Sequence, residues 1–194
     1  MQRKYTTKME PIPVIGDILW LDTVNSTNDA VRERLESLDN LSIIAAENQL
    51  SGRGQGDHLW ISEAGMNLTF SIALRFGDSR RLPARDEQLI NGFVTPAICS
   101  FLSSEGVISR VKKPNDIYVG DRKICGILVE NILEGQYVRD SIVGVGLNLN
   151  QTEFPSNLPN PVSLRLLTGK RYDTKETLLR LRKLLSGQFE TVFG

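Results

Sequence analysis

The sequence has little of what several kinds of catalytic and metal site require. Its 194 residues include only two cysteines and one histidine. Cys99 and Cys125 lie far apart and form no C-x-x-C pair, so the sequence gives no support to a zinc site. His58 has no serine or cysteine partner in sequence, which argues against hydrolysis by a Ser-His-Asp triad. The two unpaired cysteines fit a reduced, cytoplasmic setting.

An excess of one charge and a long apolar run are also missing. Lys+Arg and Asp+Glu both number 23, so the protein as a whole does not present the basic field that nucleic acids require. Any cationic site must therefore be local. The N-terminal segment contains no apolar stretch like that of a signal peptide, and no later run approaches the length of a membrane span. We expect a soluble, cytoplasmic protein that binds neither DNA nor a membrane.

What is present is the composition of an ordinary folded domain, with 40% hydrophobic and 24% charged residues. Residues 1–17 read as an N-terminal arm, and residues 18–194 as one domain. Alternating and short apolar patterns predict strands at 18–23, 42–47, 67–76, 108–112, 116–119, 123–132 and 138–149. Helical patterns run from Ser26 or Thr27 to about Leu38, over 86–102 and over 174–193. This order predicts an α+β fold, with a mixed, mainly antiparallel sheet and helices packed on one face.

A long segment without periodicity, residues 48–66, contains the sequence SGRGQGDHLW from Ser51 to Trp60. Glycines at every second position let the backbone approach a ligand and turn N–H groups toward an anion, and Arg53 adds further donors. A flexible surface loop without a ligand explains the same composition, and both interpretations stay open. A dinucleotide fingerprint is excluded because Asp57 stands where the third glycine belongs.

Cations gather in the segment KKPNDIYVGDRKICGIL, in which Lys123 comes directly before an apolar strand. A half-buried lysine needs an anion nearby. That anion belongs either to the protein, as Asp116 or Asp121, or to a substrate. Asn115 and Asp116 read either as a turn after proline or, for Asp116, as a ligand of Mg²⁺ beside phosphates.

Two further segments have both a structural and a functional interpretation. The glycines of Gly144–Asn150 mark either a bulge or a strand against which a flat ligand lies, with Asn148 as its hydrogen-bond partner. The segment Ser26–Asn28 is a helix start, and a helix N-terminus also accepts polar or anionic groups. Trp60 suits either the core or a stacking surface for a purine.

Taken in order, these motifs resemble those of the biotin protein ligases, which are also called holocarboxylase synthetases. The matching segments are Ser26-Thr27-Asn28, Gln49, GRGQGDHLW from Gly52, KKPND from Lys112, KICGIL from Lys123 and GVGLN from Gly144. The resemblance spans about residues 18–190. It implies the class II synthetase-like catalytic fold of biotin and lipoate ligases.

The resemblance also implies roles for individual residues. The residues implied to bind biotin are Ser26, Thr27, Asn28, Gln49, Gly52, Arg53, Gly54, Gln55, Lys123, Gly126 and Gly144. Those implied to lie on the nucleotide side are Trp60, Asn115 and Asn148, and Asp116 is the implied Mg²⁺ ligand. The implied catalytic cations are Lys123, Arg53 and Lys112. Gln55 and His58 replace arginines of the common motif, and Lys113 replaces a tryptophan.

The activity implied is ATP-dependent formation of biotinyl-5′-AMP, followed by transfer of biotin to a lysine of a biotin carboxyl carrier protein or domain. The alternatives are a lipoate or octanoate ligase or transferase, and a biotin- or nucleotide-binding module without catalysis. No helix-turn-helix precedes residue 18, so a repressor role is not expected. The small β-barrel domain typical of the family would begin where this chain stops, at Gly194. The sequence leaves open whether the protein forms a homodimer.

Overall fold

The computed structural model of the protein describes residues 17–56, 58–77 and 81–194. The expected arm over residues 1–17 therefore lies outside the described residues, except for Asp17. Among the described residues, no helix combines the length and the apolar character needed to cross a membrane.

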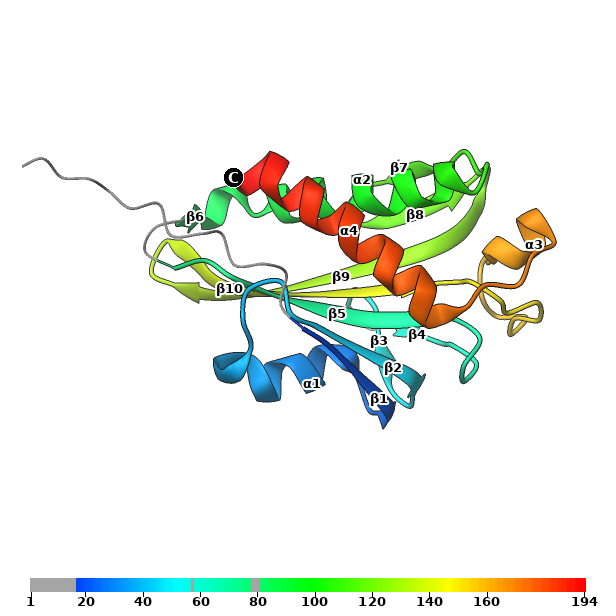
Figure 1. The fold of residues 1–194 in the computed structure, drawn as a ribbon, viewed down its shortest axis with the longest axis horizontal. Helices are drawn as coiled ribbons and strands as arrows, with labels where there is room; N and C mark the ends of the chain where they lie inside the picture. The colour runs from blue at the N-terminus through cyan, green and yellow to red at the C-terminus, as the bar shows by residue number, and fades with distance from the viewer. Residues whose placement is uncertain (1–16, 57, 78–80) are drawn as a thin grey trace, which may run out of the picture.

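One sheet organises the molecule (Figure 1). Its strands are β1 (Ile18–Val24), β2 (Ile43–Gln49), β5 (Leu68–Arg75), β6 (Leu82–Pro83), β7 (Arg110–Lys112), β8 (Asp116–Val119), β9 (Arg122–Glu134) and β10 (Tyr137–Leu147). The strand order is β1-β2-β5-β10-β9-β8-β7, with β6 paired to β10. Only β1 and β2 are parallel, and the other neighbours are antiparallel. The predicted mixed, mainly antiparallel sheet is confirmed.

Helices lie on both faces of this sheet, as Figure 1 shows. The helices are α1 (Thr27–Arg34), α2 (Gln88–Ser104), α3 (Leu164–Thr168) and α4 (Thr174–Phe193), with short 3-10 turns at Leu35–Ser37 and Ala84–Asp86. The prediction of helices on one face holds for α2 and α4, whereas α1 packs on the opposite face. Side chains alternate between the two faces along β5. Ala73 faces α1, while its neighbours Ile72 and Leu74 face the opposite side of the sheet.

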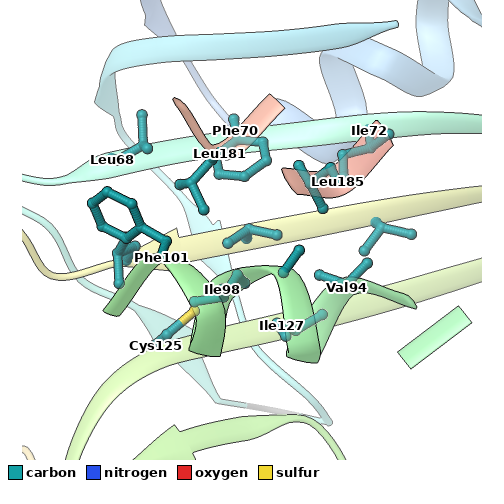
Figure 2. Packing of buried hydrophobic residues seen from close by; sticks show 14 of the residues in the cluster. Leu68, Phe70, Ile72, Val94, Ile98, Phe101, Cys125, Ile127, Leu181 and Leu185 are labelled. Carbon is teal, nitrogen blue, oxygen red and sulfur yellow. The ribbon is translucent and has the colours of Figure 1, made fainter. Parts of the chain in front are cut away.

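The main core fills the space between the sheet and the pair α2 and α4 (Figure 2). Leu68, Phe70 and Ile72 of β5 point into it, in the alternation that the sequence predicts. Phe93 of α2 meets Phe189 of α4 edge to face, with ring centroids 5.7 Å apart. Such pairs add to the stabilisation that burial alone provides. The helices α2 and α4 therefore cover the core on this face of the sheet.

Two local features differ from the sequence-based expectations, and helix α2 continues through Pro96 to Ser104. The segment 48–66 was expected to be a loop, but it contains a small hairpin of β3 (Gly52–Arg53) and β4 (Leu59–Trp60). The short helix α3 had no helical pattern long enough to predict it. The hairpin matters most, because it lies beside the part of the sheet that α1 does not cover.

Replacing Phe93 with alanine should lower the free energy of unfolding by about 3–5 kcal/mol, because the substitution leaves a cavity between α2 and α4. The matched control is Leu179→Ala on α4, whose side chain is 52% exposed. That change should alter the free energy by less than about 0.5 kcal/mol. Urea denaturation measures both. Equal effects of the two substitutions would contradict the described packing.

Candidate active site

A cavity of about 240 Å³ lies on the same face of the sheet as α1, over the part of that face that α1 does not cover. It is bounded by the start of α1, the end of β2, the β3–β4 hairpin, the turn before β8, and strands β9 and β10. The residues that line it are Ser26, Thr27, Asn28, Gln49, Arg53, Gly54, Gln55, His58, Leu59, Trp60, Pro114, Asn115, Asp116, Lys123, Gly126, Ile127, Leu128, Gly144, Val145 and Gly146. Segments far apart in the sequence therefore meet at one site.

The floor of the cavity depends on glycines in adjacent strands. Gly126 of β9 and Gly146 of β10 are paired across the sheet, and the ring of Trp60 lies against both. A Cβ atom on Gly146 would collide with that ring. A Cβ on Gly144 would collide with the side-chain amide of Asn28. The absence of side chains therefore admits Trp60 and Asn28 to the floor, so these glycines serve close packing within the protein.

A wall of amide and hydroxyl groups stands at the start of α1. Ser26 occupies the N-cap position, but its side chain makes no capping hydrogen bond. Instead, Oε1 of Gln49 accepts from the backbone N–H of Thr27 at 2.9 Å and from its hydroxyl at 3.2 Å. Ser71 donates to Oδ1 of Asn28 at 2.6 Å. These contacts fix the orientation of Gln49 and Asn28 before any ligand arrives.

Lys123 supplies a cation at the other end of the cavity. Its Nζ lies 2.8 Å from Oδ1 of Asp116 and 5.9 Å from the ring centroid of Trp60. The side chains of Lys123 and Asp116 are 31% and 26% exposed, so the pair is half-buried. The pairing with Asp116, one of the two alternatives from the sequence, is thus present, and both residues also line the cavity.

Arg53 brings a second cation from the hairpin. Its Nη2 lies 2.7 Å from Oδ1 of Asp29 and 3.3 Å from Oε1 of Glu130. The guanidinium is therefore paired with carboxylates of α1 and β9, although it also lines the cavity. Both cations of the site already have a carboxylate partner in the protein.

The turn before β8 forms the remaining side. The side-chain amide of Asn115 donates to the carbonyl oxygen of Ile127, and the N–H of Ile127 donates to the carbonyl of Asn115 at 3.1 Å. This exchange ties the turn to β9 just beyond Gly126. A second, more open hollow of about 310 Å³ adjoins the cavity and shares Gln55, Pro114, Asn115 and Leu128 with it.

Three residues named from the sequence are not among those that line the cavity. Lys112 is exposed on β7, where its Nζ lies 4.8 Å from the ring centroid of Tyr118. Gly52 is buried within the hairpin, against Gln49 and Trp60. Asn148 is buried, and its amide donates to the carbonyl of Val162 at 3.1 Å. Gly52 and Asn148 therefore pack against or hydrogen-bond to neighbouring protein groups and do not face the cavity.

Several lining residues were not predicted as site residues. They are His58, Leu59, Pro114, Ile127, Leu128, Val145 and Gly146. The strand period of two gave a usable signal for some of them. Gly146 lies two residues after Gly144, and Leu128 two residues after Gly126, so each shares a face with a residue that was predicted. The same period continues from Leu128 to Glu130, the partner of Arg53.

The described side chains favour some chemistries over others. Burial raises the pKa of the Cys125 thiol strongly, so this cysteine stays protonated and is a poor nucleophile. No group of three or more His, Cys, Asp or Glu side chains among the described residues is arranged to hold a metal ion. Asp116 is the carboxylate in the lining of the cavity, and one carboxylate suits only a cation whose other ligands come from substrate and water.

Comparison with known proteins gives the family. Residues 20–148 match the biotin/lipoate A/B protein ligase family. The chain belongs to this family. Its fold agrees with that membership, because solved structures of biotin protein ligase from Aquifex aeolicus share it.

Individual relatives of the family point the same way. The bifunctional ligase/repressor BirA of Escherichia coli is 31% identical over 145 residues, which are 75% of this chain and 44% of that protein. The chain thus spans less than half the length of this relative. A biotin protein ligase from Aquifex aeolicus in complex with biotin and ATP is 29% identical, with a TM-score of 0.73. That match covers 91% of this chain and 72% of the other. A Plasmodium falciparum LipL1–lipoate structure, 10% identical with a TM-score of 0.61, shares the fold.

Replacing Gly146 with alanine should lift the Trp60 ring from the floor, because the new Cβ overlaps the ring. The protein has two tryptophans, so a Trp20→Phe background leaves Trp60 as the only reporter. The emission maximum of Trp60 should then move to longer wavelength as the ring meets water. The control is Gly187→Ala within α4, where a Cβ meets nothing within 4 Å. An unchanged emission spectrum in Gly146→Ala would contradict the described contact.

Proposed function

We propose that this protein is an ATP-dependent biotin protein ligase. It condenses biotin with ATP to give biotinyl-5′-AMP and pyrophosphate, and it then transfers biotin to a lysine of a biotin carboxyl carrier protein or domain. The observation that carries the proposal is the cavity in which a polar wall and a half-buried lysine face each other across a glycine floor. Family membership and the similarity to a ligase that binds biotin and ATP support it.

The polar wall suits the ring system of biotin. The ureido group carries two N–H donors and one carbonyl acceptor on an otherwise apolar bicycle. Ser26, Thr27, Asn28 and Gln49 offer hydroxyls and amides that can match both kinds of group. The Trp60 ring over Gly126 and Gly146, and the Asn28 amide over Gly144, would form the surface against which a flat ring lies. Trp60 supplies the apolar surface on which the thiophane ring and the valeryl chain would pack.

The cationic end suits the reaction between two anions. The carboxylate of biotin attacks the α-phosphorus of ATP, and the bond to pyrophosphate breaks with its electron pair on the leaving oxygen. Lys123 offsets the repulsion between the reactants and stabilises the charge that develops on the phosphoryl oxygens. A charge-assisted hydrogen bond contributes roughly 1.5–3 kcal/mol, whereas holding reactants in line contributes up to about 7–11 kcal/mol. Positioning therefore outweighs any single cation.

Asp116 would have two functions, to orient Lys123 and to help hold Mg²⁺. The ion pair with this carboxylate keeps the ammonium group oriented while the cavity is empty. When substrate anions enter, Lys123 would share its three N–H donors between them and Asp116. Asp116 would also hold Mg²⁺ together with phosphate oxygens, and the bound ion would neutralise charge on the nucleotide. Asn115, fixed against β9, would bind on the nucleotide side, whereas Trp60 would face biotin.

The β3–β4 hairpin would protect the intermediate. An acyl adenylate hydrolyses in water, so it must be enclosed until the amine of the carrier lysine attacks its carbonyl carbon and AMP leaves. Arg53, Gly54 and Gln55 lie on this hairpin and line the cavity. Lys112, Gly52 and Asn148 have no direct role in this scheme. A cytoplasmic location remains a prediction from the sequence, which leaves open whether the protein forms a homodimer.

Lys123→Met should reduce biotin-dependent ATP–pyrophosphate exchange by at least about 100-fold, because it removes the cation that both anions need while keeping the length of the side chain. Arg122→Met is the matched control, since Arg122 is the exposed neighbour on the same strand and should retain normal exchange. Exchange in Lys123→Met at the wild-type rate would remove Lys123 from the reaction.

The identity of the acid is tested in the same assay by competing biotin with lipoate and octanoate. Exchange that depends on biotin, followed by a mass increase of one biotin on a carrier domain, supports the proposal. Exchange with lipoate or octanoate alone would assign the site to the other branch of the family. Binding of biotin without exchange would indicate a module that lacks catalysis.

A further inference from the structure

Glu130 of β9 is the point at which donors from two other segments converge. It accepts from Nδ2 of Asn28 at 2.7 Å, and Nη2 of Arg53 lies 3.3 Å away. Nη2 of Arg32 lies 3.4 Å from the same carboxylate. Arg32 and Asn28 belong to α1, whereas Arg53 belongs to the β3–β4 hairpin. One carboxylate therefore joins a strand, a helix and the hairpin at the edge of the cavity.

The charges of this cluster balance. Asp29 and Glu130 supply two carboxylates, and Arg32 and Arg53 supply two guanidiniums. The shortest pair is Arg53 with Asp29, at 2.7 Å. Because Arg53 contacts both carboxylates, the hairpin is attached to α1 and to β9 at once. The cluster does not line the cavity as a whole, but two of its members, Asn28 and Arg53, do.

The contact with Asn28 reaches the floor of the cavity. Nδ2 of Asn28 donates to Glu130, while its Oδ1 accepts from the hydroxyl of Ser71. Both ends of the amide are thereby assigned, and the group cannot rotate without losing a hydrogen bond. The amide lies so close to Gly144 that a Cβ there would collide with it. Loss of the Glu130 carboxylate would free one end of Asn28.

We propose that Glu130 is a positioning residue that couples the hairpin to the cavity floor. Through Arg53 it keeps the hairpin across the site, and through Asn28 it fixes an amide beside the ligand. A bound ligand that holds Asn28 in place therefore also favours the position of Glu130 that retains Arg53. This inference rests on the proposed function, since it concerns how tightly that site keeps biotin and the adenylate.

A purely structural role for Glu130 is the weaker interpretation. Its side chain is 26% exposed and that of Arg53 is 41% exposed, and ion pairs at such positions contribute little to stability. The main hydrophobic core lies on the other face of β9, and Glu130 is not a member of the smaller hydrophobic cluster under α1 on its own face. The expected effect of removing the carboxylate is therefore on ligand release rather than on folding.

The test compares Glu130→Gln with Glu134→Gln, which makes the same chemical change at the exposed end of the same strand. The probe is biotin, with dissociation followed by stopped-flow fluorescence and thermal unfolding recorded in parallel. In Glu130→Gln the dissociation rate should rise about tenfold, the factor that loss of one charge-assisted hydrogen bond commonly costs. The unfolding temperature of both variants should match that of wild type. The dissociation rate of Glu134→Gln should also match wild type.

Two further variants locate the effect. Asp29→Asn removes a contact of Arg53 without touching Asn28, and it should also speed release. In Arg53→Ala, adding Glu130→Gln should have a smaller effect than it has alone, because residues that act through one contact are non-additive. These variants also keep the test decisive if Glu130→Gln fails to fold.

The outcomes separate the inference from the proposed function. If wild-type protein does not bind biotin, both fail. If it binds biotin but Glu130→Gln and Asp29→Asn release it at the wild-type rate, only the coupling is wrong. Slower release in Glu130→Gln would also overturn the coupling, because it would mean that Glu130 competes with the ligand for Arg53. Full additivity in the double variant would show that Glu130 does not act through Arg53.

Discussion

The site depends on the close approach of one aromatic ring to the backbone of two strands. Trp60 can lie against β9 and β10 only because Gly126 and Gly146 have no side chains. That contact brings the β3–β4 hairpin over the sheet and creates an enclosed hollow instead of an open face. The other face of the same strands is covered by α2 and α4, and the cavity lies on the side of the hairpin.

The second constraint is electrostatic. Both cations of the cavity are neutralised by carboxylates of the protein, Lys123 by Asp116 and Arg53 by Asp29 and Glu130. An unpaired half-buried cation would be costly before a substrate arrives. The arrangement lowers that cost and still leaves the ammonium group able to share its donors with an anion. Because both cations are paired with carboxylates, they differ in their position in the cavity and not in having a partner.

Much of this organisation could be predicted from the sequence, and the failures have physical causes. The strands and the long helices followed from periodicity, because side chains of alternate residues have to be buried together. Helix α1 was assigned to the wrong face because a single apolar stripe does not tell which side of a sheet it covers. Lys112 and Lys123 had equal standing in the sequence, and only the register of β7, β8 and β9 separates an exposed strand from the cavity. Glu130 was missed since its partners lie 77 and 102 residues away along the chain.

The alternation of side chains along β9 links the stability of the core to the affinity of the cavity for a ligand. Cys125, Ile127 and Val129 pack into the core, while Gly126, Leu128 and Glu130 face the hollow and the hairpin. A change in volume on the inner side would tilt the strand and shift the atoms on its outer side by a comparable amount. Variants selected for heat resistance through repacking of this layer would therefore tend to differ in affinity as well. Residues that never touch a ligand would set how well it fits.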